Sequence, residues 1–225
     1  MPFTRLRPGS DDGWWSWVLT LDPLAPRSAG SSSGPAERRM AAARSGHQGD
    51  ADAARGYLGD PDPGVRATAL AALARLGALG DDDLRRGLGD SDPAVRRRAC
   101  LVAARLPRVP SPAALLGDPA AEVVEAACFA LGERGETSAV DALARVALEH
   151  PAALCRESAV AALGAIGDER GLPAVLAATR DKPAIRRRAV VALAAFDGPE
   201  VDEALARALT DRDWQVRQAA EDLGD

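Results

Sequence analysis

Residues 60–76 read DPDPGVRATALAALARL, and the arrangement of this stretch recurs along the chain. An apolar anchor, Val65, is followed directly by Arg66, and Ala69 stands four positions after the anchor. Equivalent anchors follow one another at intervals of 30, 28, 32, 30 and 31 residues, a period typical of one helical hairpin. The six anchors are Val65, Val95, Val123, Cys155, Ile185 and Val216.

The residues after each anchor have the period of an α-helix. From Val65, apolar side chains recur at steps of 4, 8 and 11 residues, and the stripe from Ile185 to Phe196 has the same spacing. The turns ahead of the anchors are rich in Asp, which caps helix N-termini, and in Pro, which fits the first helical turn. We therefore predict an all-α solenoid of about six hairpins. The first helices of these hairpins are visible in residues 138–148, 172–178 and 201–209.

The composition agrees with this fold class and narrows the possible partners. Apolar residues make up 47% of the 225-residue chain but aromatic residues only 4%, which favours closely packed helices rich in small side chains. The formal net charge of −5 argues against binding to nucleic-acid phosphates. The three cysteines form no CxxC motif, and no apolar run approaches the roughly 20 residues needed to cross a bilayer. We expect a cytoplasmic protein.

The turn and anchor residues resemble a known repeat family. Three units combine an Asp five positions before the anchor with an Arg one position after it, which resembles the signature of HEAT repeats. Residues 130–135 and 162–168 resemble the HEAT-like repeats named after phycobilisome lyases, which occur in many bacteria. The resemblance implies a right-handed solenoid over residues 36–225 and a bacterial source. The three Asp and Arg combinations are Asp60 with Arg66, Asp90 with Arg96, and Asp211 with Arg217.

These Asp and Arg side chains are expected to pair within and between repeats, forming a ladder that fixes the stacking of the helices. The ladder is interrupted, because Val124 replaces Arg in the third unit and His150 stands at the Asp position of the fourth. We expect less regular stacking there. At the N-terminal end, residues 35–44 are predicted to form a partial helix that covers the first repeat.

Residues 1–35 are rich in Pro, Gly and Ser and are predicted to be a flexible lead. Trp14, Trp15 and Trp17 are the exception within it. Two interpretations remain open: this cluster is a short linear anchor, or Met40 is the true start and the lead is not translated in the natural protein.

The family resemblance implies that the second helix of each hairpin lines the concave side. Residues two, three and six positions after each anchor then form an apolar ridge flanked by charge. The arginine runs 96–98 and 186–188 either clamp an anionic ligand or are solvated surface paired with Glu125 and Glu157. Phe129 either anchors a partner or packs on the next repeat. The predicted partner-binding residues are Arg97, Arg98, Leu101, Phe129, Arg187, Arg188 and Val191.

The sequence contains no recognisable catalytic chemistry. His47 and His150 are the only histidines, and no GxSxG motif, Walker loop or zinc spacing is present. Cys100 and Cys128 share one repeat position, which favours core packing over a redox or metal pair. Trp214 falls in a turn in this interpretation.

We therefore expect no metal and no cofactor, and a scaffold that binds a protein partner. The resemblance also allows an enzyme or enzyme-accessory subunit similar to the lyases that attach bilins. Nucleic-acid binding is a third hypothesis.

Overall fold

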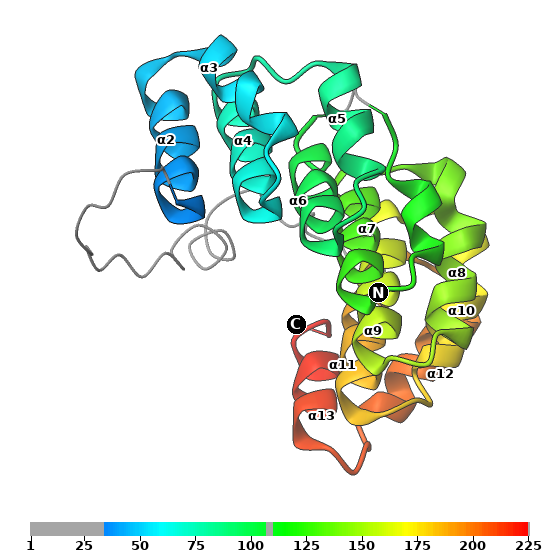
Figure 1. Cartoon of the computed structure of the whole chain (residues 1–225). Helices are drawn as coiled ribbons and strands as arrows, with labels where there is room; N and C mark the ends of the chain where they lie inside the picture. The colour runs from blue at the N-terminus through cyan, green and yellow to red at the C-terminus, as the bar shows by residue number, and fades with distance from the viewer. Residues whose placement is uncertain (1–33, 107–109, 225) are drawn as a thin grey trace. The chain divides into compact units, whose positions relative to one another are not determined.

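The computed structural model describes residues 34–106 and 110–224, and these residues contain helices and no β-strand. Helices of an inner row lie side by side in chain order, each packing on its neighbours in the row, and the row curves with the outer helices on its outside (Figure 1). The inner helices are α2 (Pro35–Gln48), α4 (Pro63–Arg75), α6 (Pro93–Ala103), α7 (Ala121–Glu133), α9 (Ala153–Ile166), α11 (Pro183–Ala192) and α13 (Trp214–Glu221).

The outer row connects successive inner helices and completes each hairpin. Among the described residues between α6 and α7, the outer position holds a short 3-10 segment, Ala113–Gly117, preceded by Pro110 and Pro112. Prolines interrupt helical hydrogen bonding, which accounts for a 3-10 segment in place of an α-helix in this described part. The outer helices are α3 (Ala51–Gly56), α5 (Asp81–Leu88), α8 (Val140–Glu149), α10 (Leu172–Ala178) and α12 (Pro199–Ala208). The predicted all-α solenoid is confirmed, whereas the tryptophan cluster at residues 14–17 lies outside the described residues.

Helix boundaries follow the capping chemistry of the turns. The carboxylates of Asp62, Asp92 and Asp213 each accept a hydrogen bond from a backbone N–H in the first turn of α4, α6 and α13, at 2.8–3.1 Å. Gly135 and Gly167 take the left-handed conformation just after α7 and α9, as expected of C-cap glycines. The prediction that Trp214 falls in a turn was wrong, because the cap at Asp213 makes it the first residue of α13.

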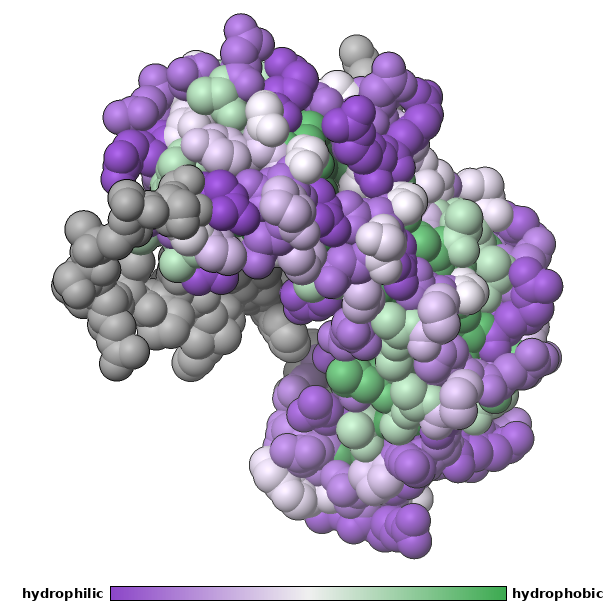
Figure 2. Space-filling view, in the orientation of Figure 1, coloured by the Kyte–Doolittle hydropathy of each residue, from purple (hydrophilic) through white to green (hydrophobic). Residues whose placement is uncertain are grey.

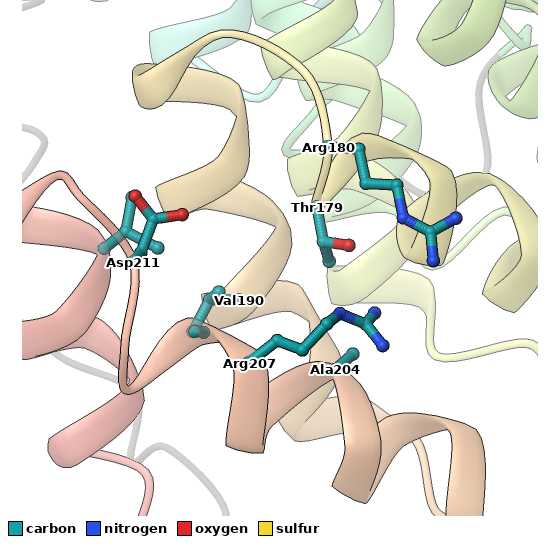
Figure 3. A pocket seen from close by; sticks show the side chains of 8 residues that line it. Thr179, Arg180, Val190, Ala204, Arg207 and Asp211 are labelled. Atoms are coloured by element: carbon teal, nitrogen blue, oxygen red, sulfur yellow. The ribbon is translucent and has the colours of Figure 1, made fainter.

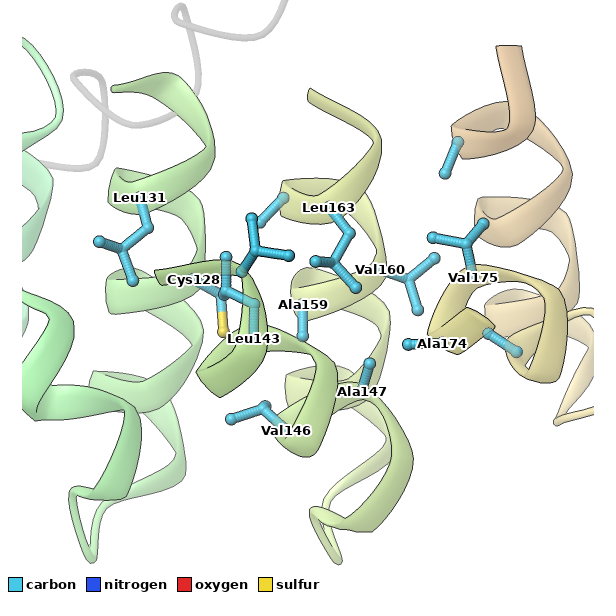
Figure 4. Packing of buried hydrophobic residues seen from close by; sticks show 14 of the residues in the cluster. Cys128, Leu131, Leu143, Val146, Ala147, Ala159, Val160, Leu163, Ala174 and Val175 are labelled. Carbon is cyan, nitrogen blue, oxygen red and sulfur yellow. The ribbon is translucent and has the colours of Figure 1, made fainter. Parts of the chain in front are cut away.

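The inner helices approach one another closely where the sequence places glycine. A Cβ atom added to Gly132 on α7 would lie 2.9 Å from the Cα atom of Ala162 on α9. A Cβ atom added to Gly164 on α9 would lie 2.6 Å from the Cβ atom of Ala192 on α11. Both distances are too short for a real side chain, so these two glycines, each the last residue of an Ala-Leu-Gly sequence (130–132 and 162–164), set the spacing from α7 to α9 and from α9 to α11. Small and branched apolar residues fill the space between the rows (Figure 4).

Arginines of the inner helices form a ladder with aspartates of the following turn. In Arg96, Nε and Nη2 donate to the two carboxylate oxygens of Asp118 at 2.7 and 2.9 Å, and Nη1 donates to the backbone oxygen of Asp90 at 2.8 Å. The carboxylate bonds therefore run between repeats, whereas only the backbone oxygen belongs to the same repeat. The other bidentate rungs are Arg38 with Asp60, Arg66 with Asp90, Arg156 with Asp181, and Arg186 with Asp211.

The rung formed by Arg38 shows that α2 acts as the inner helix of a repeat ahead of the six recognised from sequence. The predicted partial helix over residues 35–44 extends to Gln48, packs on α4 and supplies the first arginine of the ladder. The helix thus covers the first anchor-bearing helix with the same contacts that join later repeats.

The predicted gap in the ladder is present between α7 and α9. Val124 is fully buried in the place of the arginine. The Nδ1 atom of His150 accepts a hydrogen bond from the backbone N–H of Ala152 at 3.1 Å, as the aspartates of other turns do. One apolar cluster runs without a break from α6 to α12. Apolar contact therefore replaces the ionic rung, and the expected loss of regular packing is not seen in the core.

Candidate functional site

All seven predicted partner-binding residues lie on helices of the inner row. Arg97 and Val191 are exposed, and the other five are half-buried. Because α9 stands between α7 and α11, they form two groups, one on α6 and α7 and the other on α11. The first group is Arg97, Arg98, Leu101 and Phe129, and the second is Arg187, Arg188 and Val191.

An apolar ridge crosses four successive inner helices at the sixth position after each anchor. Leu101 and Phe129 pack partly on the core, and each keeps part of its side chain at the surface. Ala161 on α9 continues the ridge to Val191, which is 46% exposed. Figure 2 shows apolar surface gathered over α9 and α11 and bordered by hydrophilic residues.

The ridge gains one residue that the sequence interpretation missed. Leu154 is 55% exposed and lies one position before the anchor of α9. Its separation of seven residues from Ala161 places both on the same face of the helix. The only available signal was a large apolar residue where the other repeats carry small or polar ones.

The two arginine runs, which look alike in sequence, have different surroundings. The first arginine of each run belongs to the ladder. In the second run, Nη2 of Arg188 lies 3.6 Å from Oε1 of Glu157 on the preceding inner helix. The place equivalent to Glu157 on α4, two positions after the anchor, is held by Ala67. Arg98 therefore lacks the carboxylate that Arg188 has.

Arg97 and Arg98, the two α6 arginines outside the ladder, carry uncompensated charge. Within residues 34–106 and 110–224, neither Arg97 nor Arg98 has a carboxylate within ion-pair distance. Burial lowers the pKa of Arg98, and the neighbouring charge of Arg97 lowers it further. The expected pairing of this run with Glu125 is not formed. Glu125 occupies the place on α7 that Glu157 has on α9, where the following helix offers Ser158 instead of arginine.

The cysteines belong to the core, as predicted for Cys100 and Cys128. Both are fully buried, and burial raises the pKa of Cys100 to about 12, so its thiol stays protonated at neutral pH. Burial also raises the pKa of Cys128. In the described ranges, no three His, Cys, Asp or Glu side chains converge to hold a metal ion. No described helix combines the length and apolar character that a membrane span requires.

A cavity of about 230 Å³ lies between α10, α11, α12 and α13. Small-molecule sites usually enclose roughly 300–1,000 Å³, so this cavity is small for a substrate or chromophore. Figure 3 shows the side chains of Arg180 and Arg207 extending from its lining. The lining residues are Thr179, Arg180, Val190, Ala204, Arg207, Ala208, Asp211 and Val216.

Two family models match adjoining parts of the chain, from residue 109 to residue 211. Residues 109–184 match the family model described as HEAT repeats, and residues 185–211 match the PBS lyase HEAT-like repeat. The chain contains HEAT repeats. The matched residues begin after α6, yet α2, α4 and α6 form the same arginine rungs as the later HEAT repeats. No curated protein matches the sequence significantly.

Several solved structures share the fold of these HEAT repeats at low sequence identity. YibA of Escherichia coli is 16% identical with a TM-score of 0.58, covering 88% of this chain and 75% of YibA. A designed armadillo repeat protein in complex with the peptide (KR)4 is 18% identical with a TM-score of 0.54, covering 76% of this chain and 96% of the designed one. A chain in the complex of CpcE and CpcF of phycocyanin lyase from Nostoc sp. PCC7120 is 20% identical with a TM-score of 0.50. The match covers 86% of this chain and 91% of the Nostoc chain.

Proposed function

We propose that this protein is a non-catalytic scaffold that binds an extended segment of a partner protein along the inner face of its HEAT repeats. The apolar ridge of Leu101, Phe129, Ala161 and Val191, flanked by charged residues, carries the proposal. A half-exposed apolar row with an aromatic residue at its centre and a charged border has the composition of an interface core and rim.

The dimensions of the ridge set the length of the segment. Packed helices lie about 8–10 Å apart, so three steps from α6 to α11 span about 24–30 Å. An extended peptide advances about 3.3 Å per residue, so about seven to nine residues cover the ridge. A partner segment of this length contacts all four helices at once.

The fold is compatible with such a partner. A designed armadillo repeat protein of the same fold holds a peptide, and CpcE and CpcF form a complex with each other. We infer that the inner face of this chain likewise binds a segment of another protein.

Selection from a displayed library of random 12-residue peptides tests the proposal. We expect selected peptides to lose binding to Phe129→Ala and Val191→Asp, because both changes remove apolar contact from the ridge. The matched control is Leu148→Asp, which changes an apolar residue of similar exposure on the outer helix α8. Peptides that depend on Leu148 and not on the ridge would show that the binding face is elsewhere.

A bilin-lyase-like enzyme or an accessory subunit of one is the alternative. The PBS lyase HEAT-like repeat at residues 185–211 and the similarity to CpcE and CpcF favour it. The small volume of the cavity between α10 and α13 argues against an enclosed chromophore. Absorbance titration with a free bilin separates the two proposals, because saturable binding with a shifted spectrum is expected only for the lyase-like role.

A further inference from the structure

We infer that the α6 end of the inner face recognises carboxylate side chains, so that the partner segment it binds is acidic as well as apolar. This inference rests on the proposed function, because it names the chemistry of the segment that the same face binds. The recognition residues are Arg97 and Arg98 on α6, with Leu101 on the same helix and Phe129 on the neighbouring helix α7.

The chain itself shows how a carboxylate is held at the equivalent position three repeats later. Glu157 on α9 lies 3.6 Å from Arg188 on α11, and their side chains are 19% and 28% exposed. This internal carboxylate neutralises Arg188 at the inner face. Arg188 on α11 therefore has an acidic partner already.

The α6 end has the same arginine without the carboxylate. Ala67 stands on α4 where Glu157 stands on α9, and its methyl group leaves the position next to Arg98 without an acceptor. The lowered pKa of Arg98 shows that its charge is stabilised less than that of an arginine in water. A carboxylate from a partner supplies the missing charge and takes the place that Glu157 has in the later repeat. Arg97, which is exposed, provides a second donor group.

The surroundings favour an acidic peptide over a nucleic acid. Leu101 lies three and four residues after Arg98 and Arg97, on the same face of α6, and Phe129 has the equivalent position on the neighbouring helix α7. Apolar surface next to the arginines suits alternating acidic and apolar side chains. Glu125 and Glu133 on the neighbouring helix α7 would repel a continuous line of phosphates. The net charge of −5 acts in the same direction.

Fluorescence anisotropy of the full chain with labelled ten-residue peptides tests the inference. The acidic probe alternates Asp with Leu, and the neutral probe alternates Asn with Leu and has nearly the same shape. We expect the Asp probe to bind about tenfold more tightly than the Asn probe at low salt, because each partly desolvated charge pair contributes a factor of this order. Higher salt should reduce the difference.

Variants of the chain locate the preference. The Arg97→Ala, Arg98→Ala double variant is expected to bind both probes equally, whereas Arg85→Ala, Arg86→Ala on the outer helix α5 keeps the tenfold ratio and serves as the matched control. Ala67→Glu should reduce the ratio without abolishing it, because it gives Arg98 an internal partner and leaves Arg97 available to the peptide. Arg97 and Arg98 do not belong to the ladder, so we expect the variants to keep the fold. Thermal unfolding of each variant checks this.

A further variant removes a carboxylate from the inner face, whereas Ala67→Glu adds one. Glu157→Ala removes the internal carboxylate from Arg188 and is expected to raise the affinity for the Asp probe several-fold. Equal binding of the two probes by the parent chain would overturn the inference, as would displacement of the Asp probe by a single-stranded DNA oligonucleotide at equal charge concentration. If the parent chain binds both probes equally and Phe129→Ala still weakens binding of the Asn probe, the inference fails. The proposed function would then still stand.

Discussion

Removing one arginine of the ladder is predicted to destabilise the solenoid far more than removing its neighbour in sequence. In Arg96→Ala, the carboxylate of Asp118 loses two hydrogen bonds of 2.7 and 2.9 Å and keeps only the bond from the backbone N–H of Ala120. The change also removes the bond to the backbone oxygen of Asp90. The neighbouring Arg97 makes no such bonds and is exposed, so Arg97→Ala is the matched control.

The burial of the pair sets the magnitude. The side chains of Arg96 and Asp118 are 13% and 3% exposed. Exposed ion pairs contribute about 0–1 kcal/mol, whereas breaking a fully buried pair costs about 3–5 kcal/mol. This rung lies between these limits, so we expect the free energy of unfolding to fall by about 2–3 kcal/mol. Arg97→Ala should change it by less than about 0.5 kcal/mol.

Thermal and urea unfolding monitored by circular dichroism measure the difference. For a chain of this size, a loss of about 2–3 kcal/mol corresponds to a decrease in Tm of about 5–10 °C. The double variant Arg96→Ala, Asp118→Ala should recover part of the loss, because it no longer leaves a buried carboxylate without its partner. Equal unfolding temperatures for Arg96→Ala and Arg97→Ala would refute the structural role of the ladder.

Three further predictions concern packing, the gap in the ladder and pH. Gly164→Ala should destabilise the chain by about 1–3 kcal/mol in urea unfolding because α11 leaves no room for the methyl group, whereas Gly56→Ala, with no atom nearby, should be neutral or stabilising. Val124→Arg alone should destabilise by burying an unpaired charge, and adding His150→Asp should restore about 1–3 kcal/mol as a coupling energy in a double-mutant cycle. Hydrogen bonds from Arg96 hold the pKa of Asp118 below its usual value of about 3.9, so stability is present above that pH and is lost as the pH falls through the lowered pKa. Urea unfolding from pH 7 to pH 3 should therefore show a shallower loss in Asp118→Asn than in the parent chain.

Much of the fold was predictable because the repeat encodes each helix and its cap locally. The anchor stripes, the capping aspartates and the glycines after α7 and α9 all act within a few residues of their own position. The extension of α2 to Gln48 was harder to predict, because its arginine pairs with Asp60, 22 residues away. Trp214 was misplaced because the choice between Asp211 and Asp213 as the helix cap depends on which one binds the preceding arginine.

From the sequence, the candidate site could be predicted only as residues at equivalent positions after each anchor. Position after the anchor placed all seven residues on the inner row, but it gave Arg98 and Arg188 the same environment. Their difference depends on the identity of a residue on the preceding helix, Ala67 or Glu157, and on how far successive helices are offset. A contact of this kind emerges only when the repeats are stacked in three dimensions.

Side-chain footprinting of the full chain, with and without a selected peptide, tests the central claim most directly. Carbene labelling reports the exposure of individual side chains. The proposed function predicts that the peptide protects Leu101, Phe129 and Val191 on the inner row and leaves Leu148 on α8 fully labelled. Protection of Leu148 with unchanged labelling of the inner-row residues would contradict binding on this face.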